Sequence, residues 1–181
     1  MSVAITVLLV TIGARAFSAQ MPGTLLVPER PQPIWESCGQ MHDDYVRRFS
    51  LAAGFGPSRM VRPAMLDRSG SLEDGRGRYA IAKLELIGRL LTDTPSVYVP
   101  ILHESGSTPA FKGRDLTAFE TDALAALRAG NELVGTEPDA AGTFTCVGAL
   151  RANATCLRCH ANRKAGDLLG AFTYQLRKQT Q

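Results

Sequence analysis

This sequence has almost no surplus of charge, because 20 lysines and arginines stand against 17 aspartates and glutamates. The resulting formal charge of +3 is too small to indicate a nucleic-acid-binding surface. Internal repeats and low-complexity segments are absent, and four cysteines in 181 residues are too few for a disulfide-rich small domain. With 45% hydrophobic and 20% charged residues, the composition is that of a globular protein and excludes a disordered, collagen-like or multi-span membrane chain.

The N-terminal segment has the pattern of an export signal. Residues 3–13 form an apolar run that is too short to span a bilayer, and an A-x-A cleavage site follows at residues 14–16. No lysine or arginine precedes the run, so a retained anchor or a buried segment stays open as an alternative. We predict a signal peptide over residues 1–16, an extended leader over 17–33 and one domain over 34–181. Signal removal would leave no membrane span and an exported, periplasmic domain in a bacterium.

The rest of the chain mixes helical and strand patterns. Apolar residues spaced by three and four predict helices, one of which opens on the capping box Thr117–Glu120 and ends before Gly130. Segments rich in β-branched and aromatic residues predict strands. The predicted elements are helices over 35–49, 79–91 and 117–129, strands over 97–102, 143–150 and 168–176, and a loop over 60–76. This mixture predicts a compact α+β domain.

The strongest motif is C-x-x-C-H, formed by Cys156, Cys159 and His160. It is the attachment motif of c-type haem, in which the two thiols form thioether bonds with the two vinyl groups and the histidine becomes the proximal iron ligand. Three other interpretations stay open. They are a thioredoxin-like dithiol, a simple disulfide, and a zinc site that adds Cys146 to the motif residues.

The C-terminal part of the sequence resembles a known family. The residues Val147-Gly148-Ala149-Leu150, the motif, and then Gly166-Asp167-x-x-Gly170-Ala171 are similar to the PAS-like c-type haem sensor domains of bacteria. The resemblance covers about the last 40 residues and extends weakly to the helix after Asp115 and to Cys38. It implies an antiparallel sheet flanked by helices, with one covalent haem c near the C-terminus that senses redox state or a diatomic gas. It also implies Cys38, on an early helix, as the second axial ligand beside His160.

The residues themselves leave the second axial ligand open, because only 21 residues follow His160 and none of them is Met or His. A thiolate ligand would lower the reduction potential, a methionine would raise it, and an open position would admit a small ligand. The upstream candidates are Cys38, Met41, His42, Met60, Met65, His103 and Cys146.

We therefore predict an exported mono-haem protein that transfers single electrons or senses redox state or a gas. Its partner would be a redox protein or a small diatomic ligand, and nucleic acid is excluded. A haem enzyme with an open iron position is a weaker alternative, because no distal acid–base pair is recognisable upstream. A structural protein held by zinc or a disulfide is the third possibility.

Overall fold

The computed structural model describes residues 33–68, 71–74, 77–88, 94–101 and 110–179. The predicted signal peptide and all but the last residue of the predicted leader lie outside these residues, as does His103. None of the described helices combines the length and the apolar character that crossing a membrane requires.

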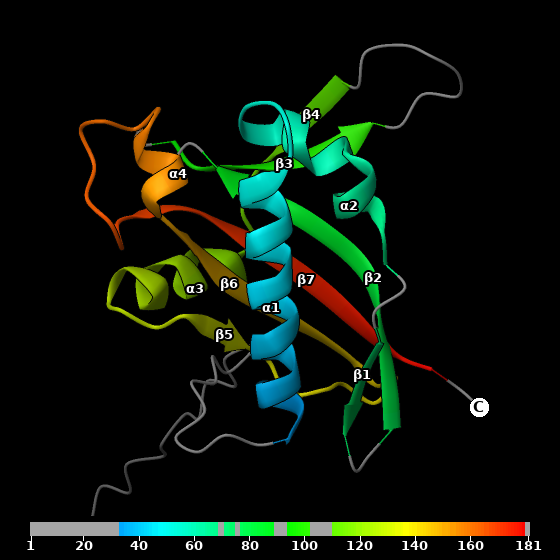
Figure 1. The fold of residues 1–181 in the computed structure, drawn as a ribbon. Helices are drawn as coiled ribbons and strands as arrows, with labels where there is room; N and C mark the ends of the chain where they lie inside the picture. Colours follow the sequence, from blue (N-terminus) through cyan, green and yellow to red (C-terminus); the bar gives the residue numbers. More distant parts are fainter. Residues whose placement is uncertain (1–32, 69–70, 75–76, 89–93, 102–109, 180–181) are drawn as a thin grey trace, which may run out of the picture.

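The centre of the fold is an open antiparallel sheet of seven strands in the order β4-β3-β2-β7-β6-β5, with β1 pairing to the first part of β2 (Figure 1). Strands from the middle and the end of the chain meet in the middle of the sheet, where β2 pairs with β7 over most of their length. The strands are β1 Ser71–Asp74, β2 Gly77–Gly88, β3 Ser96–Ile101, β4 Ala110–Arg114, β5 Leu133–Gly135, β6 Thr143–Arg151 and β7 Leu168–Lys178.

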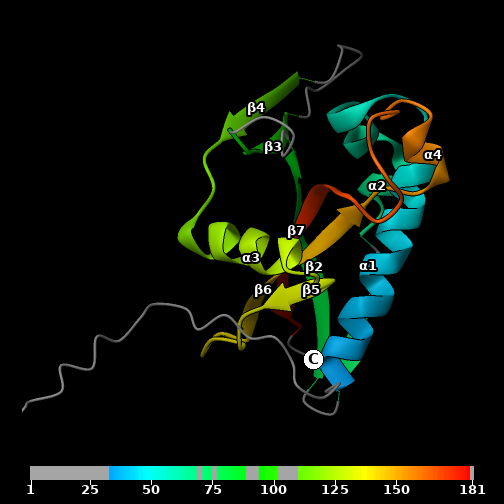
Figure 2. The ribbon, with the colours of Figure 1, turned by 90° about the vertical axis from the view of Figure 1, so that its left-hand side faces the viewer.

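Helices lie on both faces of this sheet, so the predicted α+β class is confirmed. Figure 2 shows α1, α2 and α4 on one side of the central strands and α3 on the other. The helices are α1 Pro33–Leu51, the 3-10 helix η1 Gly56–Val61, α2 Pro63–Leu66, α3 Ala118–Arg128 and α4 Ala154–Leu157. The predicted helices over 35–49 and 117–129 and the three predicted strands are confirmed.

The α1 face of the sheet carries the larger core. In β7 the even-numbered residues Phe172, Tyr174 and Leu176 are buried toward α1, because successive side chains of a strand point to opposite faces. The aromatic rings of α1 pack on them, with the Phe49 and Phe172 centroids 5.3 Å apart and those of Tyr45 and Tyr174 5.9 Å apart. The three- and four-residue spacing of α1 thus provides one continuous apolar side.

The α3 face is apolar over only part of its area. Ala123, Leu124 and Leu127 of α3 pack with Val147 and Ala171 of the sheet in a second, smaller core. The capping box predicted at the start of α3 is present, because the Thr117 side chain accepts a hydrogen bond from the Glu120 amide. Beyond the N-terminal end of α3, the same sheet face carries mostly polar side chains, among them Thr145, Thr173 and Gln175.

The predicted helix over residues 79–91 is wrong, because residues 77–88 form β2. A β-bulge between Ile81 and Lys83 shifts the register, so Ile81 and Leu84 both enter the α1-side core at a spacing of three. Residues 84–87 are buried on both faces, which removes the alternation that identifies a strand. The predicted loop over 60–76 is also too simple, since it contains the end of η1, α2 and β1.

Candidate functional site

The C-x-x-C-H motif begins in α4, a single turn held by Asn153. The Asn153 side-chain oxygen accepts hydrogen bonds from the amides of Thr155 and Cys156 at 2.9 and 3.1 Å, and its amide nitrogen donates to Ser50 Oγ of α1 at 3.1 Å. The His160 amide donates to the Cys156 carbonyl at 3.0 Å. Both motif cysteines and the histidine are therefore placed by one capped turn. Sequence reasoning missed this role, although Asn is a favoured N-cap residue.

The loop after the motif closes back on its start. The Asp167 side chain accepts a hydrogen bond from the Lys164 amide at 3.0 Å and so caps the turn. The Gly166 amide donates to the Ala152 carbonyl at 2.9 Å, and the Ala152 amide donates to the Asp167 carbonyl at 2.8 Å. Gly166 adopts φ 89°, which favours glycine. The motif and its loop are thus fixed at both ends, and β7 starts at Leu168, directly after the loop.

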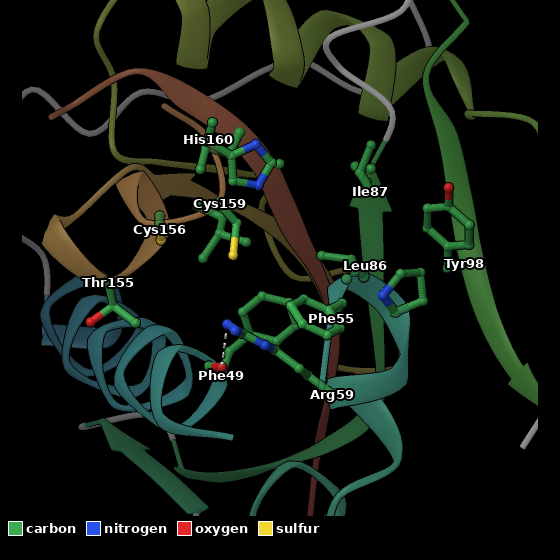
Figure 3. Close-up of a pocket in the computed structure, with 16 residues that line it drawn as sticks. Phe49, Phe55, Arg59, Leu86, Ile87, Tyr98, Thr155, Cys156, Cys159 and His160 are labelled. Atoms are coloured by element: carbon green, nitrogen blue, oxygen red, sulfur yellow. Dashed lines mark hydrogen bonds between the residues drawn. The ribbon is translucent and has the colours of Figure 1, made fainter. Parts of the chain in front are cut away.

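Cys156, Cys159 and His160 line one pocket of about 440 Å³ at the end of the sheet where β2 stops and β7 starts. Figure 3 shows the Cys159 and His160 side chains facing Leu86 and Ile87 of β2 across this pocket, with Phe55 and Arg59 along another side. The other walls are mostly apolar. The described lining residues are Phe49, Phe55, Gly56, Pro57, Arg59, Leu86, Ile87, Gly88, Tyr98, Leu150, Thr155, Cys156, Cys159, His160, Leu169 and Gly170.

Two side chains from the segment after α1 set the character of the pocket. Phe55 lines it while 76% exposed, an unusual state for a large apolar ring. Arg59 donates to the carbonyls of Gly54 and Phe49 at 2.9 and 3.1 Å, and its guanidinium lies 5.3 Å from the Phe49 ring centroid. Among the described lining residues it is the only Arg or Lys. The pocket therefore offers apolar walls and one fixed positive charge.

The structure does not bring Cys38 to this pocket. Cys38 lies eleven residues before Phe49 on α1, about 16 Å along the helix axis. It is 0% exposed and packs in the α1-side core with Cys146, which is also 0% exposed. The hydrogen bond with Cys38, together with burial, raises the pKa of the Cys146 thiol well above its usual value. Cys38 therefore occupies a buried thiol pair rather than the site of the motif.

The other proposed iron ligands in the described residues are also engaged elsewhere. His42 Nε2 lies 2.9 Å from the Ala149 carbonyl, which can only accept, so Nε2 donates and Nδ1 accepts from the Tyr174 hydroxyl at 2.9 Å. Burial lowers the pKa of His42 against the opposing effect of the Ala149 hydrogen bond. Met60 and Met65 are buried in the α1-side core, and Met41 is partly buried and packs against it.

The zinc interpretation is not supported by the arrangement of the described residues. They include no group of three or more His, Cys, Asp or Glu side chains placed to hold a metal ion. Cys146 is buried in β6 with Cys38, and it does not line the pocket of the motif. All four cysteines are free thiols in the structure, with Cys156 half-buried and Cys159 exposed.

Comparison of the chain with models of protein families, with curated proteins and with solved structures found no match. What the pocket can hold is therefore judged from its own residues. Two free thiols three positions apart suit two vinyl groups, an adjacent imidazole suits iron, and the apolar walls suit the faces of a macrocycle. Arg59 suits a carboxylate at the rim. The residues present fit a covalently attached haem.

Proposed function

We propose that this chain carries one haem c, attached through Cys156 and Cys159, with His160 as the proximal ligand. The observation that carries the proposal is that all three residues of the C-x-x-C-H motif line one largely apolar pocket. The apolar fraction of the wall matters, because a porphyrin presents two large apolar faces that water solvates poorly. The ring of Phe55, exposed at this pocket, gains a partner of the same character.

Different residues of the pocket would attach the haem, exclude water from it and neutralise its charge. Haem, when bound, supplies an iron centre that exchanges one electron or takes a small axial ligand. The capped turn at Asn153 positions the two thiols, so that the imidazole of His160 directly follows the second attachment point. Leu86, Leu150 and Leu169 would exclude water from the interior, and the guanidinium of Arg59, held by the Gly54 carbonyl, would neutralise a carboxylate of the haem.

Within this proposal, binding of a small diatomic ligand is favoured over simple electron transfer. Among the described lining residues His160 is the only histidine, and no methionine is present. Cys38 and His42 are sequence candidates for the second iron ligand, but their polar atoms form hydrogen bonds within the α1-side core. With His160 as its only ligand from the described pocket residues, the iron of a bound haem would be able to take an external small molecule. Electron exchange with a redox partner protein remains the second role.

The location and the family are part of the same proposal. Export to the periplasm is supported by the apolar run and the A-x-A site before residue 17, and it would supply the compartment in which bacterial haem c is attached. A PAS-like arrangement is supported by the antiparallel sheet with β2 and β7 paired at its centre and helices on both faces.

The test is expression of the full chain together with a cytochrome c maturation system, with a known cytochrome c matured in the same cells as the positive control. We expect covalent haem that survives denaturation and gives the pyridine haemochrome spectrum of two saturated vinyl groups. Cys156→Ala and Cys159→Ala should each lose one thioether bond, and the double variant should lose covalent haem. Cys38→Ala is the matched cysteine control and should keep it.

A second measurement separates the two roles. Carbon monoxide added to the reduced protein should shift the absorption spectrum at micromolar concentration if the distal position is open. A folded chain without covalent haem, beside a correctly matured control cytochrome, would refute the proposal. A haem that binds no carbon monoxide would retain the attachment and assign the protein to electron transfer.

A further inference from the structure

A second cavity lies on the α3 face of the sheet, away from the C-x-x-C-H motif. It has a volume of about 360 Å³, and nine of its ten described lining residues are polar or charged. Its residues come from β2, β6, β7, the ends of β4 and β5, and the first turn of α3, the elements seen around α3 in Figure 2. The described lining residues are Lys83, Glu85, Arg114, Thr117, Phe119, Glu120, Thr136, Thr145, Thr173 and Gln175.

The floor of this cavity is set by strand register. Gln175 of β7 lies directly between Lys83 of β2 and Thr145 of β6, and Thr173 lies opposite Glu85 in the next row of the same face. The Thr145 amide donates to Thr136 Oγ1 at 3.1 Å, which extends the first row beyond β6. Because three paired strands supply these side chains, their relative positions are fixed by the sheet rather than by loops.

Arg114 forms one wall and has no capacity left for a ligand. Its Nε donates to Glu85 Oε2 at 3.2 Å, its Nη1 donates to Glu120 Oε2 at 2.8 Å and to the Asp115 carbonyl at 3.0 Å, and its Nη2 donates to Glu120 Oε1 at 2.7 Å and to Glu85 Oε2. All five N–H groups of the guanidinium are thereby used. The cavity is therefore not an anion site built on Arg114.

The carboxylate of Glu85 is only half satisfied. Glu85 is 2% exposed, and its Oε2 takes the hydrogen bonds from Arg114. Its Oε1 is buried and accepts no hydrogen bond from any described residue. The Lys83 ammonium lies 2.9 Å from Oε1 as an ion pair, but the Lys83 side chain is 51% exposed and stands at the edge of the cavity. This ion pair with Lys83 is the sole partner of the buried Oε1 among the described residues, and a ligand ammonium that takes its place keeps the oxygen paired while it frees Lys83.

We propose that this cavity binds a small zwitterion with a primary ammonium group, such as a free amino acid. The ligand ammonium donates to Glu85 Oε1 in place of Lys83, and the displaced Lys83 ammonium pairs with the ligand carboxylate. The side chains of Thr145, Thr173 and Gln175 complete the polar contacts, while Phe119 offers an apolar surface to the rest of the ligand. A volume of about 360 Å³ is at the lower end of small-molecule sites and suits a ligand of this size.

The test uses nitrogen-labelled full chain and two-dimensional amide spectra, with each common amino acid as a separate probe at millimolar concentration. Butylamine and butyrate serve as probes that carry only one of the two charges. We expect at least one amino acid to shift the amides of Lys83, Thr145 and Thr173 in a saturable manner, and to bind at least tenfold more tightly than either single-charge probe.

Variants then assign the contacts. Glu85→Gln removes the charge that holds the ammonium and should weaken amino-acid binding at least tenfold, whereas Lys83→Met should bring the amino acid down to the affinity of butylamine. Because Glu85 also holds Arg114, Gln175→Leu is a second variant that leaves the Arg114 network intact and should weaken binding as well. Thr143→Val, on the same face of β6 outside the cavity, is the matched control and should bind normally.

Three outcomes would overturn the proposal. The first is the absence of saturable shifts at these amides with every amino acid, in a protein whose spectrum shows that it is folded. The second is a saturable ligand whose affinity is the same for Gln175→Leu, Glu85→Gln and the unchanged chain. The third is butyrate binding as tightly as the amino acids, which would contradict recognition through Glu85. Each result is independent of haem attachment, because this cavity and the pocket of the C-x-x-C-H motif have no lining residue in common.

Discussion

The two faces of the sheet are built from the same strands but in different ways. On the α1 face, β7 buries the large side chains of Phe172, Tyr174 and Leu176, and an aromatic cluster runs from Phe49 through Phe172 and Tyr174. On the α3 face, the alternate residues Ala171, Thr173 and Gln175 are small or polar. Packing therefore stabilises one face, whereas charged and hydroxyl groups leave a cavity on the other. A single strand thus serves the core and a candidate binding site at once.

The largest expected effect contrasts adjacent residues of β7 that point to opposite faces. Phe172→Ala should lower the free energy of unfolding by about 3–5 kcal/mol, because it removes a fully buried ring from contact with Phe49 and His42. Thr173→Ala should cost less than about 1 kcal/mol, since it deletes little packed volume. Urea unfolding of both variants in the same haem state measures the difference. Equal losses would show that the two faces contribute alike to stability.

An intermediate effect is expected at Gly148, which lies beneath His42 on the α1 face. A Cβ at this position would approach the His42 ring to 2.4 Å, so Gly148→Ala should cost about 1–3 kcal/mol by overpacking. Gly39 in α1 is the matched control, because its Cβ would meet no atom within 4 Å. Gly39→Ala should stabilise the chain by about 0.5–1 kcal/mol. Thermal unfolding midpoints that move in the same direction would contradict this account of the α1 face.

The smallest expected effect is a difference in how the two faces make the free energy of unfolding depend on pH. The pKa of His42 is lowered by burial, so below about 6.5 the unfolded chain binds a proton that the folded chain does not, and stability falls as the pH falls. On the α3 face, burial acts to raise the pKa of Glu120, but hydrogen bonds from Arg114 and Thr117 hold it below its usual value. The contribution of Glu120 is therefore present above about 4.5 and lost only below that pH.

The measurement is the free energy of unfolding between pH 7 and 5.5, a window in which Glu120 stays ionised. The unchanged chain should lose about 1 kcal/mol over this range, and His42→Gln should flatten that loss while retaining a neutral polar side chain. A parallel decline in both proteins would assign the pH dependence to groups other than His42.

Local signals predicted the parts of this fold in which one pattern dominates. The aromatic spacing from Trp35 to Phe49, the capping box at Thr117 and the C-x-x-C-H motif are each contained in a short segment. The sequence predicts a helix where β2 lies, because a bulge and burial on both faces give this strand apolar residues at helical spacing. The strand order and the partners of the buried polar residues depend on tertiary contacts, which no short sequence pattern contains.

The second axial ligand and the polar cavity illustrate that limit. Cys38 has a helical position that suits a ligand, but its partner Cys146 is 108 positions away and only the folded sheet brings the two thiols together. The ion pairs of Arg114 with Glu85 and with Glu120 similarly join β2, β4 and α3. Such pairings depend on strand order, which the sequence patterns left open.

The burial of Cys38 and Cys146 has a chemical consequence for the whole chain. Once the chain has folded, a thiol reagent, an oxidant or another protein's disulfide can reach Cys156 and Cys159, while the two thiols of the core are shielded from solvent. The four cysteines are thus sorted into reactive and inert pairs by folding alone. Mispairing between the two sets requires unfolding, so the native state protects its own reactive pair from the competing thiols of the same chain.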